Sequence, residues 1–436
     1  MKQYQVFRFI DVVFDESRQA AIMRYALDDE ITLTDEVAFT FEPADGYNRA
    51  ALERVLRSLW LVNGVSYYKA AMAPQLDVRA AELTPAEAEF LSRTYRLGLG
   101  QLCYENQLSL DRVARFMAAD GAVARPVSLA GQSGGSLVGL GGGKDSLVST
   151  TLLDGAGEDF ATFSATYMPE SNPALARLAA AIGHEHLTIR RRFDPQLMEL
   201  NRAGAYNGHV PVTAIVMLIG LAAAVLSNRR QVVMSNEASA GEGNAVYEGE
   251  EINHQYSKSI EFEWALAEHI RTSISPDLAV FSLLRPLGEL QIAELFSRGP
   301  LERFAGLYSS CNRNFRHDAT QFTWCGQCSK CAFVYLILAP FVSKDRLNEL
   351  IGPNLLAQPS LETTYRELLG LSGHKPFECV GEIEECRAAA TLALASGNYP
   401  ELARFGVPPT RRDQRELGPS VMPEHYRRLV EEAMRA

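Results

Sequence analysis

The sequence predicts an α/β protein whose central β-sheet is mostly parallel and carries helices on both faces. Between residues 137 and 339, short apolar runs alternate with helical stretches, which is typical of β-α-β units. The run at 137–140 leads into three glycines directly before a helix start, as expected at the carboxyl end of a strand in such a sheet. Before residue 130 the pattern differs, because apolar and polar residues alternate over short segments.

The first 130 residues are expected to form an α+β domain. Segments 6–10 and 31–34 alternate apolar and polar side chains, which predicts short antiparallel strands. The segment Thr84-Pro85-Ala86-Glu87 has the form of a capping box and predicts the start of a helix. The glycine- and serine-rich stretch 131–136 is expected to link this domain to the next one.

Residues 131–345 are expected to form the main α/β domain. Its strand candidates are the runs at 137–140, 160–166, 187–189 and 231–234. The apolar stretch 210–226 is too short and too interrupted for a membrane span, so we expect a helix buried against the sheet. Residues 346–436 are helical in pattern and mixed in charge, which predicts a small C-terminal lobe.

Composition restricts the class of partner. The 436 residues carry a formal net charge of −11, whereas proteins that hold nucleic acid need basic surface, so no nucleic-acid partner is expected. The chain has seven cysteines, an odd number, and its first residues show no signal-peptide pattern. A reducing cytoplasm is therefore the expected compartment, with no membrane association.

The glycine-rich loop predicts a phosphate site. Glycines let backbone N–H groups approach phosphate oxygens, and the N-terminus of the following helix attracts negative charge. A Walker A loop would have glycine in place of Val138 and Ser or Thr in place of Asp145. The loop instead resembles the PP-loop of enzymes that split ATP between its α- and β-phosphates. The expected ATP ligands are Gly141, Gly142, Gly143, Lys144, Asp145 and Ser146, with Asp145 also holding Mg²⁺.

Four cysteines have the spacing of a metal site. Cys311, Cys325, Cys328 and Cys331 form a C-x13-C-x2-C-x2-C array, which matches the four thiolates that tetrahedral Zn²⁺ prefers. We expect a structural zinc here, although a metal-free cluster of buried thiols and an iron–sulfur cluster also fit. The other three cysteines, Cys103, Cys379 and Cys386, are expected to be core thiols.

A long polar segment follows the strand candidate at 231–234. Residues 235–263 contain many side chains of the kinds used at active sites and show no apolar period. Because the segment follows a strand of the predicted sheet, we expect its polar groups to face the same crevice as the glycine-rich loop. The catalytic candidates in it are Glu237, Tyr247, His254 and Lys258.

Five segments together resemble the UDP-N-acetylmuramoyl-L-alanyl-L-glutamate epimerase family. They are Gly141 to Ser146, Ser235-Asn236-Glu237, Asn253 to Ser259, Cys325 to Cys331 and Pro376 to Gly381. The order and spacing of the set carry the resemblance, which spans nearly the whole chain. It implies conversion of the terminal L-glutamate of a UDP-muramoyl dipeptide into D-glutamate with ATP and Mg²⁺. Such an enzyme would serve peptidoglycan precursor synthesis and act after a ligase that adds L-glutamate.

The implied chemistry has a physical reason. A carboxylate's α-proton is very hard to remove, but adenylation gives a mixed anhydride whose enolate positioned donors can stabilise. On this hypothesis Glu237 or His254 is the base, and Tyr247 and Lys258 are donors. The sequence does not rank these four residues.

Two other functions compete with this interpretation. One is a different PP-loop enzyme, a ligase or a nucleobase- or tRNA-modifying enzyme that works through an adenylated intermediate. The acidic balance of the chain and the lack of an added domain disfavour it. The other is a non-catalytic, zinc-stapled nucleotide-binding protein. The presence of Lys144, Asp145 and Ser146 together disfavours that alternative.

Overall fold

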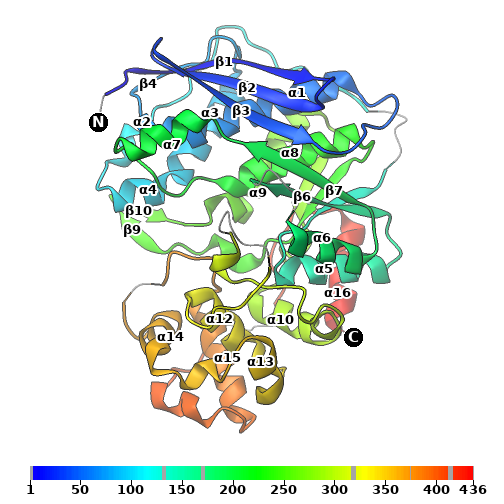
Figure 1. Cartoon of the computed structure of the whole chain (residues 1–436), viewed down its shortest axis with the longest axis vertical. Helices are drawn as coiled ribbons and strands as arrows, with labels where there is room; N and C mark the ends of the chain where they lie inside the picture. Colours follow the sequence, from blue (N-terminus) through cyan, green and yellow to red (C-terminus); the bar gives the residue numbers. More distant parts are fainter. Residues whose placement is uncertain are drawn as a thin grey trace.

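A continuous β-sheet organises the molecule. The computed structural model describes residues 3–129, 134–167, 172–315, 321–373, 375–410 and 416–435. Half of the linker expected at 131–136, residues 131–133, lies outside the described residues, and Ser136 already belongs to a strand. Nine strands form one sheet in the order β11-β8-β5-β6-β7-β3-β2-β1-β4. Figure 1 shows the N-terminal strands at one end of the molecule and the helical C-terminal region at the other.

Five strands form the parallel half of this sheet, in which all neighbours run in the same direction. They are β5 (Ser136–Gly139), β6 (Phe160–Thr166), β7 (His186–Arg192), β8 (Gln231–Met234) and β11 (Ala279–Ser282). The strands predicted at 160–166 and 231–234 have those bounds. The strand predicted at 187–189 continues to Arg192. The prediction ended too early because the last three residues of the strand are arginines, which break the apolar pattern.

The N-terminal strands continue the same sheet. The parallel part agrees with the prediction, but the sheet as a whole is mixed because it extends into the N-terminal region. Strands β1 (Val6–Asp15), β2 (Ala20–Leu27) and β3 (Ile31–Phe39) are antiparallel, and β4 (Gln75–Asp77) is parallel to β1. Strand β3 also pairs antiparallel with β7, so the sheet is mixed. The boundaries expected near residues 130 and 345 stay predictions, although the sheet runs across the first of them.

A buried ion pair lies where the two halves of the sheet meet. Arg191 of β7 donates to Asp35 of β3 at 2.8 Å and to Ser66 at 3.0 Å, and the Arg191 and Asp35 side chains are 2% and 0% exposed. Ser66 belongs to α2 (Val65–Ala71), so the guanidinium joins two strands and a helix. Burial opposes the charge of Arg191, but Asp35 outweighs this effect and raises its pKa.

Helices cover both faces of the parallel strands. Successive residues of β5 show this, because Leu137 packs into one apolar cluster and Val138 into another. The first cluster includes helices α1 (Arg49–Asn63), α3 (Pro85–Gly98), α8 (Val212–Leu226) and α9 (Ile260–His269). The second includes α5 (Lys144–Gly155), α6 (Pro173–Ile182), α10 (Glu289–Ser297) and α11 (Pro300–Arg303). The capping box predicted at Thr84 and Glu87 is present at the start of α3.

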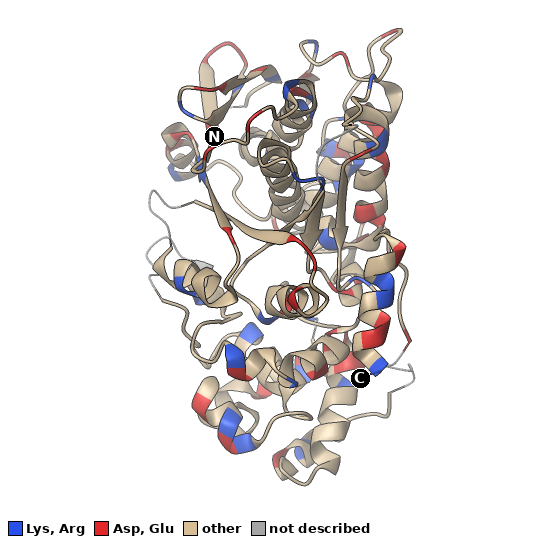
Figure 2. Cartoon of the chain, turned by 90° about the vertical axis from the view of Figure 1, so that its right-hand side faces the viewer, with Lys and Arg blue, Asp and Glu red and all other residues tan. Residues whose placement is uncertain are grey.

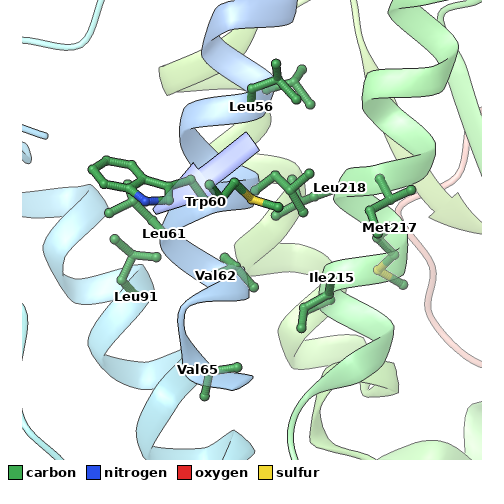
Figure 3. Packing of buried hydrophobic residues seen from close by; sticks show 14 of the residues in the cluster. Leu56, Trp60, Leu61, Val62, Val65, Leu91, Ile215, Met217 and Leu218 are labelled. Atoms are coloured by element: carbon green, nitrogen blue, oxygen red, sulfur yellow. The ribbon is translucent and has the colours of Figure 1, made fainter. Parts of the chain in front are cut away.

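Helix α8 is the apolar segment expected to pack on the sheet, and its burial confirms that prediction. In Figure 3, Ile215 and Leu218 of α8 lie opposite the side chains of α1, among them Leu56 and Val62. Thirteen residues of α8 are buried. Among the residues that the structure describes, no helix is long and apolar enough to cross a membrane.

The C-terminal region is helical, as predicted. It contains α13 (Lys344–Leu350), α14 (Glu362–Leu368) and α15 (Ile383–Ala395), which pack with α12 (Ser329–Leu338) in the second cluster. The last helix, α16 (Glu424–Arg435), returns to the sheet, where the hydroxyls of Tyr426 and Ser136 are 2.7 Å apart. In Figure 2, basic and acidic residues are interspersed on this side of the molecule. The expectation that no nucleic acid binds stays a prediction.

We predict that Asp35→Ala destabilises the fold strongly, because it leaves the Arg191 guanidinium buried without its counter-ion. The expected loss in the free energy of unfolding is about 3–5 kcal/mol, measured by urea denaturation. The control is Glu261→Ala, which removes an ion pair with Arg93 whose side chains are 51% and 48% exposed, and it should cost less than about 1 kcal/mol. Equal losses in the two variants would contradict this role of Asp35.

Candidate functional site

A cavity of about 330 Å³ lies at the carboxyl ends of β5, β6 and β8. The crevice at this edge of a parallel sheet is where α/β proteins usually bind ligands. The glycine-rich loop forms one wall and the polar segment after β8 forms another, as the sequence predicted. Charged or nucleophilic side chains in the lining are Asp145, Glu237, Lys258, Lys330 and Cys379.

The loop between β5 and α5 has the geometry of an anion site. Gly142 has a φ of +84°, and a Cβ there would lie 2.3 Å from the ring of Phe322, so this position requires glycine. Gly143 caps α5 without a side-chain hydrogen bond, which leaves the first N–H groups of the helix available to a ligand. Gly141, Gly143, Asp145 and Ser146 line the cavity.

Lys144 lies behind the cavity wall. Its side chain is 2% exposed, and its ammonium group contacts the carboxylates of Asp145 and Glu289. Burial alone would lower the pKa of Lys144, but the two carboxylates raise it above its ordinary value. Burial raises the pKa of Glu289 even though Lys144 acts in the opposite direction. The predicted phosphate contact of Lys144 stays a prediction, and in this structure the ammonium holds Asp145 in place.

A second buried cation, Arg285, fixes the opposite wall. Its guanidinium lies 2.8 Å from Glu263 of α9 and also donates to the backbone carbonyls of Glu237 and Lys258. The Arg285 and Glu263 side chains are each 1% exposed. Glu263 also accepts a hydrogen bond of 3.1 Å from the backbone of Ser282 at the end of β11. These contacts hold together Glu237 and Lys258, two cavity-lining residues that lie far apart in the sequence of the polar segment.

Lys258 contacts Cys379 inside the cavity. Its Nζ donates to Cys379 Sγ at 3.2 Å. Burial opposes ionisation of the Cys379 thiol, but Lys258, a hydrogen bond with His254, and Lys330 outweigh it and lower the pKa to about 6. Cys379 is half-buried and lines the cavity, which differs from the expected core thiol, whereas Cys103 and Cys386 are buried as expected.

The four predicted catalytic residues lie at different distances from the cavity. Glu237 and Lys258 line it. His254 lies behind Cys379, hydrogen-bonded to Gln101 of α4 (Gly100–Glu105), with its ring 4.3 Å from that of His209. Tyr247 does not line the cavity. It lies on the hairpin of β9 (Ala245–Tyr247) and β10 (Glu250–Ile252), where the centre of its ring is 5.6 Å from the centre of the Tyr104 ring.

The four cysteines of the predicted metal site come together. Their sulfur atoms all lie within 4.8 Å of one another. Cys311 and Cys328 are 3.9 Å apart, Cys325 and Cys331 are 3.8 Å apart, and Cys328 and Cys331 are 3.5 Å apart. Four thiolates around one tetrahedral Zn²⁺ would be separated by about 3.8 Å, so this cluster fits a zinc ion.

The cluster also supports the cavity. Cys331 lies in α12, whose residue Lys330 lines the cavity and donates to the backbone carbonyl of Cys379. Asn312, beside Cys311, lines the cavity as well. A metal held by the four sulfurs would therefore fix the segment that carries Lys330 and, through it, the position of Cys379.

Three important residues of the site, Arg285, Glu289 and Cys379, were not predicted from the sequence. Arg285 and Glu289 flank Pro286-Leu287-Gly288 shortly after β11, and this strand–proline–helix pattern is the signal that could have found them. Cys379 carried a weaker signal, because it lies in the loop-like segment 375–381. Its neighbours in space, Lys258 and His254, are more than 120 positions away in the chain.

The fold and the cavity define an α/β protein with a glycine-rich strand–loop–helix site and an adjacent four-thiol centre. Two family models match the chain: the MurL N-terminal domain over residues 1–283 and the MurL C-terminal domain over residues 307–404. The chain therefore belongs to the MurL epimerase family.

Three relatives support this assignment, each named UDP-N-acetyl-alpha-D-muramoyl-L-alanyl-L-glutamate epimerase. The protein from Xanthomonas oryzae pv. oryzae is 39% identical over 92% of this chain and 88% of its own length. The protein from Salinispora tropica is 40% identical over 90% and 85%. The protein from a Micromonospora strain is 41% identical over 90% and 87%.

We predict one zinc ion per chain, because four clustered thiolates have the spacing that the ion requires. Metal analysis of the purified protein tests this. Cys325→Ser should lose the metal and lower the melting temperature, whereas Cys103→Ser, outside the cluster, should keep it. Wild-type protein that stays metal-free after expression with added zinc would contradict the prediction.

Proposed function

We propose that this chain uses ATP to epimerise the terminal L-glutamate of UDP-MurNAc-L-Ala-L-Glu to D-glutamate. The names of three relatives that share about 90% of the chain support the substrate. The reaction belongs to peptidoglycan precursor synthesis, follows the ligation of L-glutamate, and takes place in the cytoplasm. AMP and pyrophosphate are the other products.

One observation carries the ATP part of this proposal. The cavity places the N-terminus of α5 in the same space as Glu237, Lys258 and Cys379. The N-terminus of α5 suits a nucleotide phosphate, and the three side chains suit proton transfer. An enzyme that activates an acyl group and then removes a proton beside it needs both at one site.

Activation has a clear chemical purpose. The α-proton of a carboxylate resists removal because the product would carry two negative charges on one small group. Once the carboxylate is adenylated, the enolate formed on loss of the proton carries one charge on its oxygen, which nearby cations stabilise. Lys258 and Lys330 are the cations in the cavity lining that suit this role. Hydrolysis of the anhydride after reprotonation releases AMP.

The loop residues have separate tasks in this scheme. Gly141, Gly143 and the first turn of α5 would bind the phosphates, with Ser146 as a hydroxyl donor. Asp145 would hold Mg²⁺, which supplies positive charge at the phosphates. Lys144 orients Asp145 from behind, since its ammonium bridges Asp145 and Glu289.

We predict that the purified chain, given UDP-MurNAc-L-Ala-L-Glu, ATP and Mg²⁺, releases AMP and yields D-glutamate after acid hydrolysis of the product. Chromatography of nucleotides and a chiral analysis of glutamate measure the two outcomes. AMP without D-glutamate would contradict the epimerase and favour another adenylating reaction.

A matched pair of variants tests the loop assignment. Asp145→Asn at the start of α5 should lower AMP release at least about 100-fold, because the metal ligand is lost. Asp154→Asn at the other end of α5 removes a surface carboxylate that pairs with His184 and Arg303, and it should leave AMP release unchanged. Full activity of Asp145→Asn would refute the assignment.

A further inference from the structure

The cavity contains a cysteine whose surroundings suit acid–base chemistry. Cys379 Sγ accepts a hydrogen bond of 3.2 Å from Lys258 Nζ and lines the same cavity as the glycine-rich loop. Its thiol also hydrogen-bonds with His254, which Gln101 holds from the other side. The backbone carbonyl of Cys379 is fixed in turn by Lys330.

These neighbours stabilise the thiolate. Lys258 and Lys330 are cations, and the hydrogen bond between His254 and the sulfur also favours the thiolate. The carboxyl groups near this cluster act in the opposite sense: Glu378 precedes the cysteine, and Glu237 and Asp145 interact with Lys258. The two cations and the hydrogen bond prevail, so a large fraction of Cys379 is ionised at neutral pH.

The two other cysteines outside the four-thiol centre do not share this environment. Cys103 and Cys386 are buried, and burial raises the pKa of each thiol, to about 11 for Cys103. The cation cluster is therefore particular to Cys379 among the three cysteines outside the four-thiol centre. A structural thiol needs no such cluster, because a neutral S–H packs well in an apolar site.

We propose that the Cys379 thiolate exchanges the Cα proton of the glutamyl substrate, with Lys258 as the positioning residue that keeps the sulfur ionised and aimed into the cavity. This assignment rests on the proposed function, since it needs an activated acyl group. It replaces the earlier choice between Glu237 and His254 as the base. His254 acts through Cys379, because it lies behind the sulfur.

The proton balance of the step is simple. The Cα–H bond breaks, its electron pair moves into the enolate, and an S–H bond forms on Cys379. Epimerisation requires a proton on the opposite face of the Cα, and a water molecule that enters the cavity supplies it and becomes hydroxide. The hydroxide then takes the proton from the Cys379 thiol and becomes water again, so the enzyme returns to its initial state.

Separate readouts of activation and proton exchange test this assignment. The wild type is incubated with UDP-MurNAc-L-Ala-L-Glu, ATP and Mg²⁺ in D₂O, and AMP and Cα deuterium are measured in the same samples. Cys379→Ala should lower deuterium incorporation about 10²- to 10⁴-fold. In the same variant, the fold-loss of AMP release should be at least about tenfold smaller than the fold-loss of deuterium incorporation. Cys103→Ala, a core cysteine, is the control and should match the wild type in both.

Thiol reactivity gives a readout that does not depend on turnover. Alkylation of Cys379 by iodoacetamide, located by mass spectrometry, should rise with pH through a midpoint near 6, because only the thiolate reacts. Removing the nearby cation in Lys258→Met should move the midpoint upward by at least about one pH unit. The deuterium exchange rate of the wild type should rise through the same pH range.

Three results would overturn the assignment. Cys379→Ala that exchanges the Cα proton at the wild-type rate shows that another group is the base. An alkylation midpoint near the ordinary thiol value in the wild type shows that the cations do not ionise Cys379. A wild type that forms no AMP fails at the earlier step, so the proposed function falls and the assignment with it.

Discussion

The buried guanidinium of Arg285 holds together the wall of the cavity that carries Glu237 and Lys258. It bonds to Glu263 of α9 and to the carbonyls of Glu237 and Lys258, while Glu263 also accepts from the backbone at the end of β11. A backbone segment without regular structure cannot hold side chains in place by itself. One cation that binds two of its carbonyls supplies the missing constraint, and it ties them to the rigid edge of the sheet.

A similar arrangement holds the wall formed by the glycine-rich loop. Lys144 is buried against Asp145 and Glu289, so the first turn of α5 is fixed to the first turn of α10. Burying charges is costly, and replacing such a group with an apolar cluster would often stabilise a protein. Buried ion pairs at both walls therefore favour a role in orientation, since they fix the side chains that line the cavity between them. The four-thiol centre stabilises a third wall through Lys330.

Local patterns in the sequence predicted the local parts of the structure. The strands at 160–166 and 231–234, the start of α3 and the burial of α8 followed from periodicity and capping. The four clustered cysteines followed from their spacing. The pairing of β3 with β7 did not, because it joins distant segments and depends on a buried pair, Asp35 and Arg191, that has no sequence signature. The same limit applied to Cys379, whose chemistry depends on Lys258 and His254 across the fold.

The central claim is that ATP activates a carboxylate of the substrate, and an oxygen label tests it most directly. The glutamyl carboxylates of UDP-MurNAc-L-Ala-L-Glu are enriched in ¹⁸O, and the AMP released with Mg²⁺ and unlabelled water is analysed by mass spectrometry. Attack of the carboxylate on the α-phosphorus, followed by attack of water on the acyl carbon, transfers one ¹⁸O to AMP. We expect singly labelled AMP together with D-glutamate. Unlabelled AMP alongside D-glutamate would show that ATP is cleaved without acyl activation.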